Sequence, residues 1–166
     1  FKPEIIVHMA AQSIVRESFE NPIYTFETNI IGTANLLEIS KELSSIKSIL
    51  VITSDKCYEN IEKNISYKET DKMGGHDPYS ASKGCAELIA ASYHRSFFYD
   101  SYDVSLATAR AGNVIGGGDW ATDRLIPDFV RALQNESAIE IRYPNSLRPW
   151  QYVLEPLRGY LMLAEK

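Results

Sequence analysis

The stretch Ser48-Ile49-Leu50-Val51-Ile52-Thr53 decides the class of fold. Its unbroken run of β-branched and aliphatic side chains predicts a strand that is buried on both faces, as the strands of parallel sheets are. Residues 4–7 and 104–109 form similar apolar runs and predict two more buried strands. Parallel strands need crossover connections, which are usually helices, so we expect helices between these runs.

Two segments between the runs have the features of helices. Residues 23–43 carry apolar side chains at helical spacing. Pro78 suits the first turn of a second helix, which we expect to continue to about residue 99 with Asp77 as its N-cap. Farther along, the sequence predicts a Gly-rich turn within 112–123, helices at 126–134 and 156–166, and short strands at 139–141 and 150–153.

This order of strands and helices predicts an α/β fold, a Rossmann-like doubly wound parallel sheet. Such a domain opens with a strand and a Gly-rich turn that binds pyrophosphate, and we find no such turn at the start of this sequence. We therefore expect an incomplete sheet, without the N-terminal half of the dinucleotide domain and most of a C-terminal substrate domain. Residues 1–120 would carry the catalytic residues, and residues 121–166 would begin the substrate-binding region.

Composition and charge argue against several classes of protein. The 166 residues are 45% hydrophobic, which suits one globular domain. The sequence has no run of about 18 uncharged apolar residues and no secretory signal at its start, so we expect no membrane span. The net charge of -5 argues against a nucleic-acid partner.

The cysteines and histidines suggest neither disulfides nor a metal site. Cys57 and Cys85 are too few for a disulfide framework, and they favour reduced thiols in a cytoplasmic protein. His8, His76 and His94 have no metal-ligand spacing among themselves or with the cysteines. We therefore expect no bound metal.

Polar segments follow the predicted strands, at the edge where parallel sheets bind their ligands. These segments are residues 8–12, 54–58 and 111–119, and we expect them to converge on one crevice. Tyr79 and Lys83 are spaced i, i+4 and so lie on one face of a helix. The ammonium group should favour the phenolate and lower the pKa of the phenol from about 10. Alone, this spacing is common, and an exposed helix pair also accounts for it.

The motifs of this chain, taken together and in order, resemble the extended short-chain dehydrogenase/reductase family over essentially the whole sequence. They are His8-Met9-Ala10-Ala11-Gln12, Thr28-Asn29-Ile30-Ile31-Gly32-Thr33, Thr53-Ser54-Asp55-Lys56 and Pro78-Tyr79-Ser80-Ala81-Ser82-Lys83. The Asp after Ser54 resembles the nucleotide-sugar 4,6-dehydratases of that family, although most of them have Glu where this chain has Lys56. That lysine, with residues 111–120 and 148–157, resembles the members that act on CDP-glucose.

The resemblance implies a lyase that uses NAD to dehydrate a nucleotide sugar, with CDP-glucose favoured. It also implies a homodimer that forms through the helices containing Asn29 and Tyr79. The implied catalytic residues are Ser54, Asp55, Lys56, Tyr79 and Lys83. The implied NAD contacts are His8, Ala10, Ala11, Gln12, Asn29, Thr53, Tyr79 and Lys83. The implied substrate contacts are Arg16, Asn113, Arg124, Leu125 and Arg148.

The implied reaction is redox-neutral and gives a 4-keto-6-deoxy sugar for deoxysugar biosynthesis. Tyr79 would take the proton of the glucose 4-hydroxyl, with Ser54 bonded to the same oxygen. Asp55 would protonate the departing 6-hydroxyl. Lys56 lies two residues beyond Ser54, on the same side of an extended run. It would be either the base at carbon 5 or an electrostatic stabiliser of the enolate.

Alternatives remain at this point. The first is another epimerase, reductase or dehydratase of the same family, and the identity of the product separates it from the reaction above. The second is a chain that is inactive by itself. The arginines suit a diphosphate because a guanidinium fork binds phosphate oxygens bidentately, but for each of them a structural role stays open.

Overall fold

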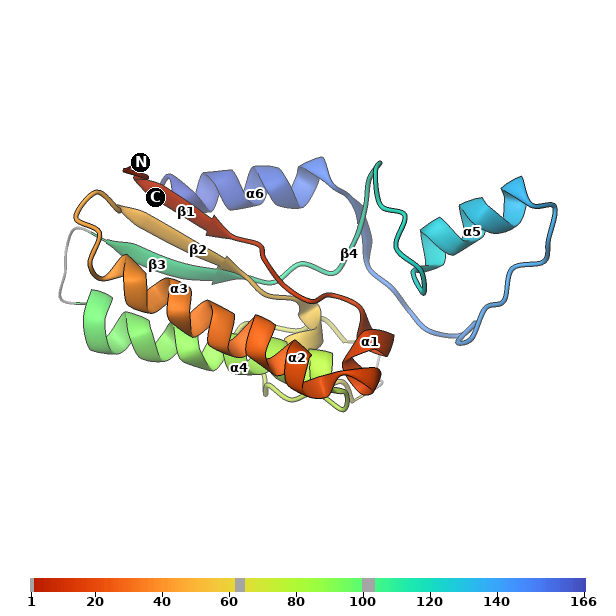
Figure 1. The fold of residues 1–166 in the computed structure, drawn as a ribbon, viewed down its shortest axis with the longest axis horizontal. Coiled ribbons are helices and arrows are strands. Elements are labelled where there is room, and N and C mark those ends of the chain that lie inside the picture. The colour runs from red at the N-terminus through yellow and green to blue at the C-terminus, as the bar shows by residue number, and fades with distance from the viewer. Residues whose placement is uncertain (1, 62–64, 100–103) are drawn as a thin grey trace.

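Three parallel strands in the order β1–β2–β3 form the central sheet of the molecule (Figure 1). β2 (Ser48–Ile52) lies in the middle, between β1 (Ile5–His8) and β3 (Ser105–Ala109). The parallel, Rossmann-like α/β sheet that the sequence predicts is confirmed. The structure is a computed structural model, which describes residues 2–61, 65–99 and 104–166.

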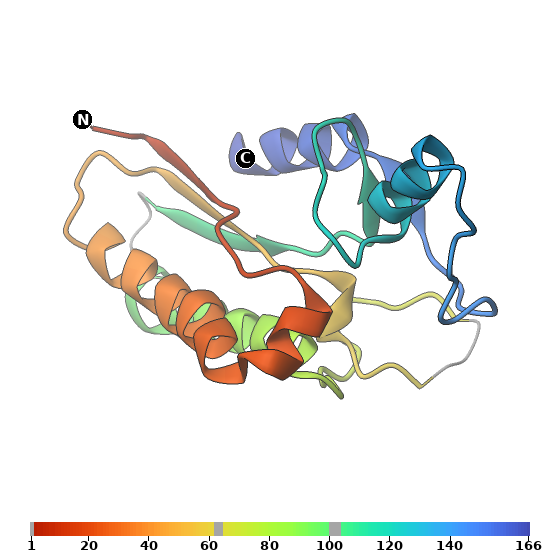
Figure 2. The ribbon, with the colours of Figure 1, turned by 45° about the vertical axis from the view of Figure 1, so that its right-hand side comes forward.

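Helices cover both faces of this sheet (Figure 1 and Figure 2). Two long helical segments lie on one face, and a shorter helix, α6 (Leu154–Ala164), lies along the other and packs against β2. The helices that the sequence predicts here are confirmed. The first long segment consists of α2 (Pro22–Phe26), a π-helical turn η1 (Glu27–Ile31) and α3 (Gly32–Ser40), and the second of α4 (Pro78–Tyr93) and a π-helical turn η3 (His94–Phe98).

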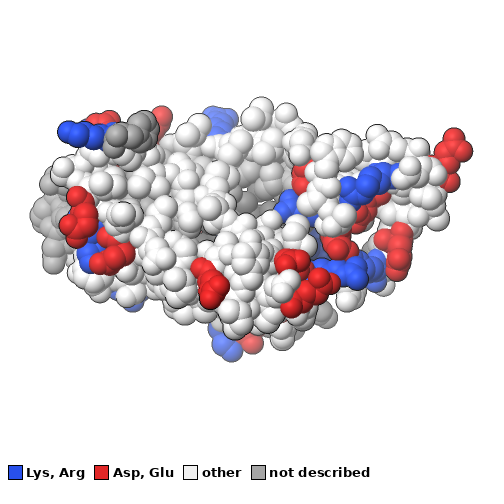
Figure 3. Space-filling view, viewed as in Figure 1, with Lys and Arg blue, Asp and Glu red and all other residues white. Residues whose placement is uncertain are grey.

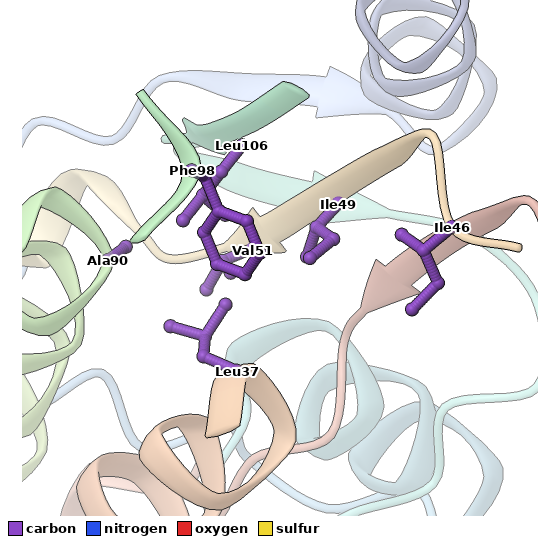
Figure 4. Packing of buried hydrophobic residues seen from close by; sticks show 7 residues of the cluster. All are labelled: Leu37, Ile46, Ile49, Val51, Ala90, Phe98 and Leu106. Carbon is purple, nitrogen blue, oxygen red and sulfur yellow. The ribbon is translucent and has the colours of Figure 1, made fainter. Parts of the chain in front are cut away.

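The hydrophobic core lies between the sheet and the two long helical segments (Figure 4). Leu37 of α3 and Val51 of β2 are no more than 1% exposed. Burying an aliphatic side chain of this size stabilises a fold by about 1.5–3 kcal/mol. The cluster therefore fixes α3 and α4 against β2, and its members are Leu37, Ile46, Ile49, Val51, Ala90, Phe98 and Leu106.

β1 is less buried than the sequence predicts. Ile5 is 47% exposed and Val7 is 36% exposed, whereas Ile49 and Val51 of β2 are each 1% exposed. The difference follows from position, because β2 has a hydrogen-bonded neighbour on each side and β1 has one. In the part of the chain that the structure describes, nothing pairs with the other edge of β1.

A small second sheet combines a predicted strand with a segment that the sequence predicts as a turn. The strand predicted at 150–153 is confirmed. β4 (Asn113–Ile115) pairs in parallel with β5 (Trp150–Tyr152), so the expectation of a turn is wrong for residues 113–115. The turn itself follows, with Gly118 at a φ of 86° that favours glycine. The predicted strand at 139–141 is also wrong, since these residues form no strand in the structure.

The remaining helices lie around the carboxyl ends of the central strands. α5 (Leu125–Gln134) confirms the helix predicted near residue 126. The other two were not predicted. α1 (Val15–Glu20) follows the segment after β1, and a short 3₁₀ helix, η2 (Asp55–Cys57), follows β2.

Candidate active site

A cleft of about 1170 Å³ lies beyond the carboxyl ends of the parallel strands. Residues from each of the three segments that follow the strands line it, among them Met9, Ser54 and Asn113. The predicted convergence of these segments is therefore confirmed. Charged side chains of both signs gather on the right-hand side of the molecule, around α1 and α5 (Figure 3).

The start of α4 sets the position of Tyr79. The Asp77 carboxylate accepts hydrogen bonds from Ser80 N at 2.9 Å and from Ser80 Oγ at 2.7 Å. Pro78 occupies the first turn, where a missing N–H costs nothing. The N-cap that the sequence predicts is confirmed, and it places Tyr79 in the first turn of α4, on the wall of the cleft.

Tyr79 and Ser54 meet at this wall. The Ser54 hydroxyl is near enough to the Tyr79 phenol to affect its pKa, and it donates a hydrogen bond to Asp55 Oδ1 at 3.1 Å. Burial raises the pKa of Tyr79 above its ordinary value; the Ser54 hydrogen bond and the charge of Arg124 oppose this shift, and Asp55 adds to it. The expectation of a lowered phenol pKa is therefore not met by the residues of this chain alone.

Lys83 lies one turn beyond Tyr79 and is buried. Its Nζ donates a hydrogen bond to the carbonyl oxygen of Ile52 at 3.2 Å. Burial lowers the pKa of Lys83, and the negative charge of Glu87 opposes that shift. The end of β2 and the first turns of α4 are thus joined directly at the residues that the sequence marks as catalytic.

Lys56 lines the same cleft as Ser54 and Tyr79, but not by the route that the sequence suggests. Residues 55–57 form the 3₁₀ helix η2 instead of an extended run. The Ser54 side chain caps this helix by accepting from Lys56 N at 3.2 Å. Ser54, Asp55 and Lys56 all line the cleft in this arrangement.

The predicted cofactor residues differ in where they lie relative to the cleft. Thr53 and Tyr79 line the cleft. His8, Gln12, Asn29 and Lys83 are buried and hydrogen-bonded within the protein, while Ala10 is exposed and Ala11 half-buried. Gln12, Asn29 and Lys83 support the backbone beside the cleft through hydrogen bonds to main-chain groups.

His8 lies behind the cleft in its neutral form. The Thr33 hydroxyl donates its proton to Asn29 O at 2.7 Å, so it accepts from His8 Nε2, which lies 3.1 Å away. This fixes the proton of the imidazole on Nε2. Burial lowers the pKa of His8, and the charge of Lys83 lowers it further.

The predicted substrate residues Arg16, Asn113, Arg124, Leu125 and Arg148 all line the cleft. Two of them are already paired with carboxylates. Arg124 Nη1 donates to Asp119 Oδ2 at 2.7 Å, and Arg16 Nη1 donates to Asp123 Oδ1 at 3.1 Å. Arg124 also bonds the Ser13 hydroxyl. These contacts connect α1 and the residue Ser13 before it with residues 119–124, just before α5, at the mouth of the cleft.

Sequence reasoning missed other residues of this region. Arg142 lines the cleft and shares Asp123 with Arg16, at 3.4 Å from Asp123 Oδ1. Only its closeness to Arg148 in a polar stretch could have indicated it. Glu87 and Arg110 were also missed, although they form a largely buried ion pair, 2.8 Å between Oε2 and Nη2, beside Thr53.

Cys57 adjoins the site without a chemical role. Its side chain is fully buried, and burial raises the pKa of its thiol to about 11. The thiolate needed for nucleophilic attack is therefore scarce at neutral pH. Among the residues that the structure describes, no cluster of three or more potential ligands could hold a metal ion. No described helix combines the length and apolar character needed to cross a membrane.

A Rossmann-like sheet whose middle strand is followed by Ser54, beside a helix that carries Tyr79 and Lys83, is the arrangement of the extended short-chain dehydrogenases/reductases. The family comparison is more specific. The model of the GDP-mannose 4,6 dehydratase family matches residues 1–166, and the chain belongs to this family.

Curated relatives agree with this assignment. The chain is 56% identical to the CDP-glucose 4,6-dehydratase of Salmonella typhimurium over 170 aligned positions, which cover 100% of this chain and 47% of that enzyme. It is 28% identical to the dTDP-glucose 4,6-dehydratase of Streptomyces griseus, over 93% of this chain and 45% of that enzyme. The chain thus spans about half the length of the curated relatives it matches.

Solved structures show the same fold. A double mutant of the dTDP-glucose 4,6-dehydratase of Streptomyces venezuelae, crystallised with NAD, is 29% identical, with a TM-score of 0.86 over 97% of this chain and 48% of that one. The UDP-glucose 4-epimerase of Thermotoga maritima, crystallised with UDP-glucose, is 25% identical, with a TM-score of 0.85 over 99% of this chain and 52% of that one. The fold alone therefore does not separate dehydratases from epimerases.

Proposed function

We propose that the full-length protein uses NAD to dehydrate CDP-glucose to CDP-4-keto-6-deoxyglucose. By the full-length protein we mean a chain that extends over the whole length of its relatives. The observation that carries the proposal is that Tyr79, Ser54 and Lys56 line one cleft at the end of β2. The 56% identity to the Salmonella CDP-glucose enzyme supports it.

The polar groups beside Tyr79 suit NAD. In the described part of the chain, Lys83 Nζ makes one hydrogen bond, to Ile52 O, so its other donors remain for ribose hydroxyls. NAD would supply redox chemistry, by accepting hydride from carbon 4 of the sugar and returning it to carbon 6. We assign its contacts to the residues that the family resemblance implies: His8, Ala10, Ala11, Gln12, Asn29, Thr53, Tyr79 and Lys83.

Tyr79 is the proposed base for the 4-hydroxyl proton. Burial holds the phenol in its neutral form, so its ionisation needs positive charge nearby. Arg124 is a cation of this chain that favours the ionised phenol, and oxidised nicotinamide would add one more positive charge. Ser54, whose hydroxyl favours the ionised phenol, would orient the oxygen that receives the proton.

Asp55 and Lys56 are the proposed pair for the loss of water. A 4-ketone acidifies the proton at carbon 5, and elimination then breaks the bond from carbon 6 to its hydroxyl. Lys56 either takes the carbon 5 proton or stabilises the enolate by its charge. Asp55 gives a proton to the departing hydroxyl. Both side chains line the cleft on the side of Ser54, so they can act on the sugar that Tyr79 oxidises.

The arginines at the mouth of the cleft are the proposed contacts for the diphosphate. Arg16 and Arg124 each hold a carboxylate in this structure, and a diphosphate would compete for the same guanidinium groups. The complete proposed substrate set is Arg16, Asn113, Arg124, Leu125 and Arg148.

The identity of the product tests this function. We expect the full-length protein, incubated with NAD and CDP-glucose, to give a sugar nucleotide that has lost one water and carries a 4-ketone. A parallel incubation with dTDP-glucose should react more slowly. A product that retains all hydroxyls, with only inverted stereochemistry, would show an epimerase instead.

We further propose a cytoplasmic homodimer that associates through the long helical segments, with a domain boundary near residue 120. Large apolar side chains on these segments support the dimer: Ile23, Ile39 and Leu88 are each more than half exposed. Such side chains are typical of helix faces that pack against a partner. Sedimentation of the full-length protein as a monomer at micromolar concentration would contradict the dimer.

A further inference from the structure

A buried carboxylate on α4 joins the sheet to the catalytic helix. Glu87 is 4% exposed and accepts four hydrogen bonds from three side chains. Thr108 Oγ1 donates at 2.9 Å, Arg110 donates through Nε at 2.9 Å and Nη2 at 2.8 Å, and Thr53 Oγ1 donates as well. Burial by itself would raise the pKa of Glu87, but these hydrogen bonds outweigh it and lower the pKa. Glu87 is therefore ionised and forms an ion pair with Arg110.

Arg110 reaches from this carboxylate to the loop that follows η2. Its Nη1 donates to Glu69 O at 3.2 Å, and its guanidinium lies 4.9 Å from the centre of the Tyr58 ring. The Tyr58 ring in turn stacks on Tyr67, with 4.8 Å between the ring centres. A cation over an aromatic face is attracted by the ring electrons. Arg110 therefore holds the two ends of the loop together.

The two partners of the ion pair fix the chain on both sides of Lys56. Upstream, Glu87 bonds Thr53, and downstream, Arg110 covers Tyr58. Between these points the backbone forms η2, and Gly74 N donates to Cys57 O at 2.9 Å. The place of Lys56 at the cleft thus depends on anchors that are not themselves in the cleft lining.

We propose that the Glu87–Arg110 ion pair positions Lys56 for the elimination of water. This inference rests on the proposed function of the cleft. Glu87 and Arg110 do not line the cleft, so they are positioning residues that act through the chain between Thr53 and Tyr58. Their loss should slow the step that uses Lys56 more than the step that uses Tyr79, because the Asp77 cap also fixes the first turn of α4, where Tyr79 lies.

Charge-matched variants separate positioning from stability. Arg110→Met leaves the Glu87 carboxylate buried without its cation, and should destabilise the full-length protein. The double variant Arg110→Met with Glu87→Gln removes both charges, so we expect it to recover much of the melting temperature without recovering the anchor. Lys72→Met is the matched control, because it breaks an exposed ion pair with Glu59 in the same loop.

Single-turnover kinetics with NAD and CDP-glucose provide the first readout. In the double variant, NADH should form within about threefold of the wild-type rate and then decay about 10- to 100-fold more slowly, the range expected for a group misplaced by about 1 Å. Lys72→Met should behave as wild type. Wild-type decay of NADH in the double variant, or an equal loss in Lys72→Met, would overturn the proposal.

Hydrogen exchange provides a second readout that does not require the proposed reaction. In the double variant, amides of Glu59 and Gly74, which are bonded across the loop, should exchange at least about tenfold faster, while amides of β2 stay protected. Unchanged protection of the loop would overturn the positioning role. If the wild type forms no NADH with CDP-glucose, the proposed function fails, and the exchange result alone then decides whether the ion pair anchors the loop.

Discussion

Asn29 Nδ2 donates a hydrogen bond to Ser82 Oγ at 2.8 Å, which joins the π-helical turn η1 to α4, the helix that carries Tyr79. The same amide also holds the segment after β1, since Oδ1 accepts from Gln12 N at 2.8 Å and Nδ2 donates to Gln12 O at 2.9 Å. Ser82 Oγ in turn donates a hydrogen bond to Tyr79 O at 2.7 Å. One buried side chain therefore holds three segments around Tyr79, and π-turns are frequent at such sites.

Replacement of Asn29 by Leu should destabilise the protein by at least about 2 kcal/mol. The change leaves the N–H and C=O of Gln12 and the Ser82 hydroxyl without this partner, and an unsatisfied buried polar group costs about 1–3 kcal/mol. Urea unfolding of the full-length protein measures it. Asn21→Ala, at an exposed amide that bonds Glu17, should stay within about 0.5 kcal/mol of wild type. Equal shifts for the two variants would contradict the role of Asn29.

Tyr79→Phe should abolish oxidation at carbon 4 and leave the fold intact. Loss of a positioned acid–base group reduces turnover by about 10²–10⁴-fold. The formation of NADH with CDP-glucose measures oxidation at carbon 4, and the circular dichroism spectrum shows whether the fold is intact. Tyr93→Phe is the control on the same helix, since its hydroxyl bonds the exposed Glu38 at 2.9 Å. Near wild-type turnover in Tyr79→Phe would show that the catalytic assignment is wrong.

The stability of the protein should fall as the pH drops through about 6.5, in part because of His8. Burial and the charge of Lys83 lower the pKa of His8 in the folded state. The unfolded chain therefore binds more protons in this range, and stability rises with pH. Glu87, whose folded pKa is lowered, contributes stability that is lost only below about pH 4.5.

Urea midpoints between pH 7 and pH 5 measure the contribution of His8. His8→Gln, which keeps a donor near Thr33, should reduce the slope of stability against pH. His76→Gln, at an exposed imidazole, should leave the slope as in wild type. A slope that is unchanged by His8→Gln would contradict the buried, neutral state of this residue.

The parts of the fold that the sequence predicts are those with a local signal. The apolar run of β2 and the pair Asp77–Pro78 at the start of α4 depend on neighbouring residues, so they are correctly placed. The pairing of β4 with β5 is different, because each strand is only three residues long and too short to show the alternation of side chains that marks a strand. Their pairing depends on distant segments meeting, which no local pattern reports.

The residues of the site likewise divide into those with a local sequence signal and those whose role depends on tertiary contacts. The i, i+4 spacing of Tyr79 and Lys83 is local, and the structure puts both beside the end of β2. In the sequence, Glu87 has no feature that distinguishes it from an ordinary carboxylate on a helix. It becomes a buried anchor because the fold places Arg110, which follows β3, beside it. The burial of Tyr79, which raises the pKa of its phenol, likewise comes from tertiary packing and has no local signal.

Lys56→Ala should separate the two halves of the reaction. In the proposed mechanism Tyr79, on α4, takes the proton of the 4-hydroxyl, whereas Lys56 belongs to η2, so its loss should leave the first proton transfer in place. We expect oxidation at carbon 4 to continue and elimination to stop. Lys72→Met, at an exposed lysine farther along the same loop, should complete the reaction as wild type does.

The most direct test of this division of labour is a single turnover of full-length Lys56→Ala with NAD and CDP-glucose, followed by absorbance. We expect enzyme-bound NADH to form at close to the wild-type rate and to persist, with a 4-keto sugar that keeps its 6-hydroxyl and takes up no solvent deuterium at carbon 5. A correctly folded Lys56→Ala protein that forms no NADH would contradict it, because Lys56 would then be needed for the step assigned to Tyr79.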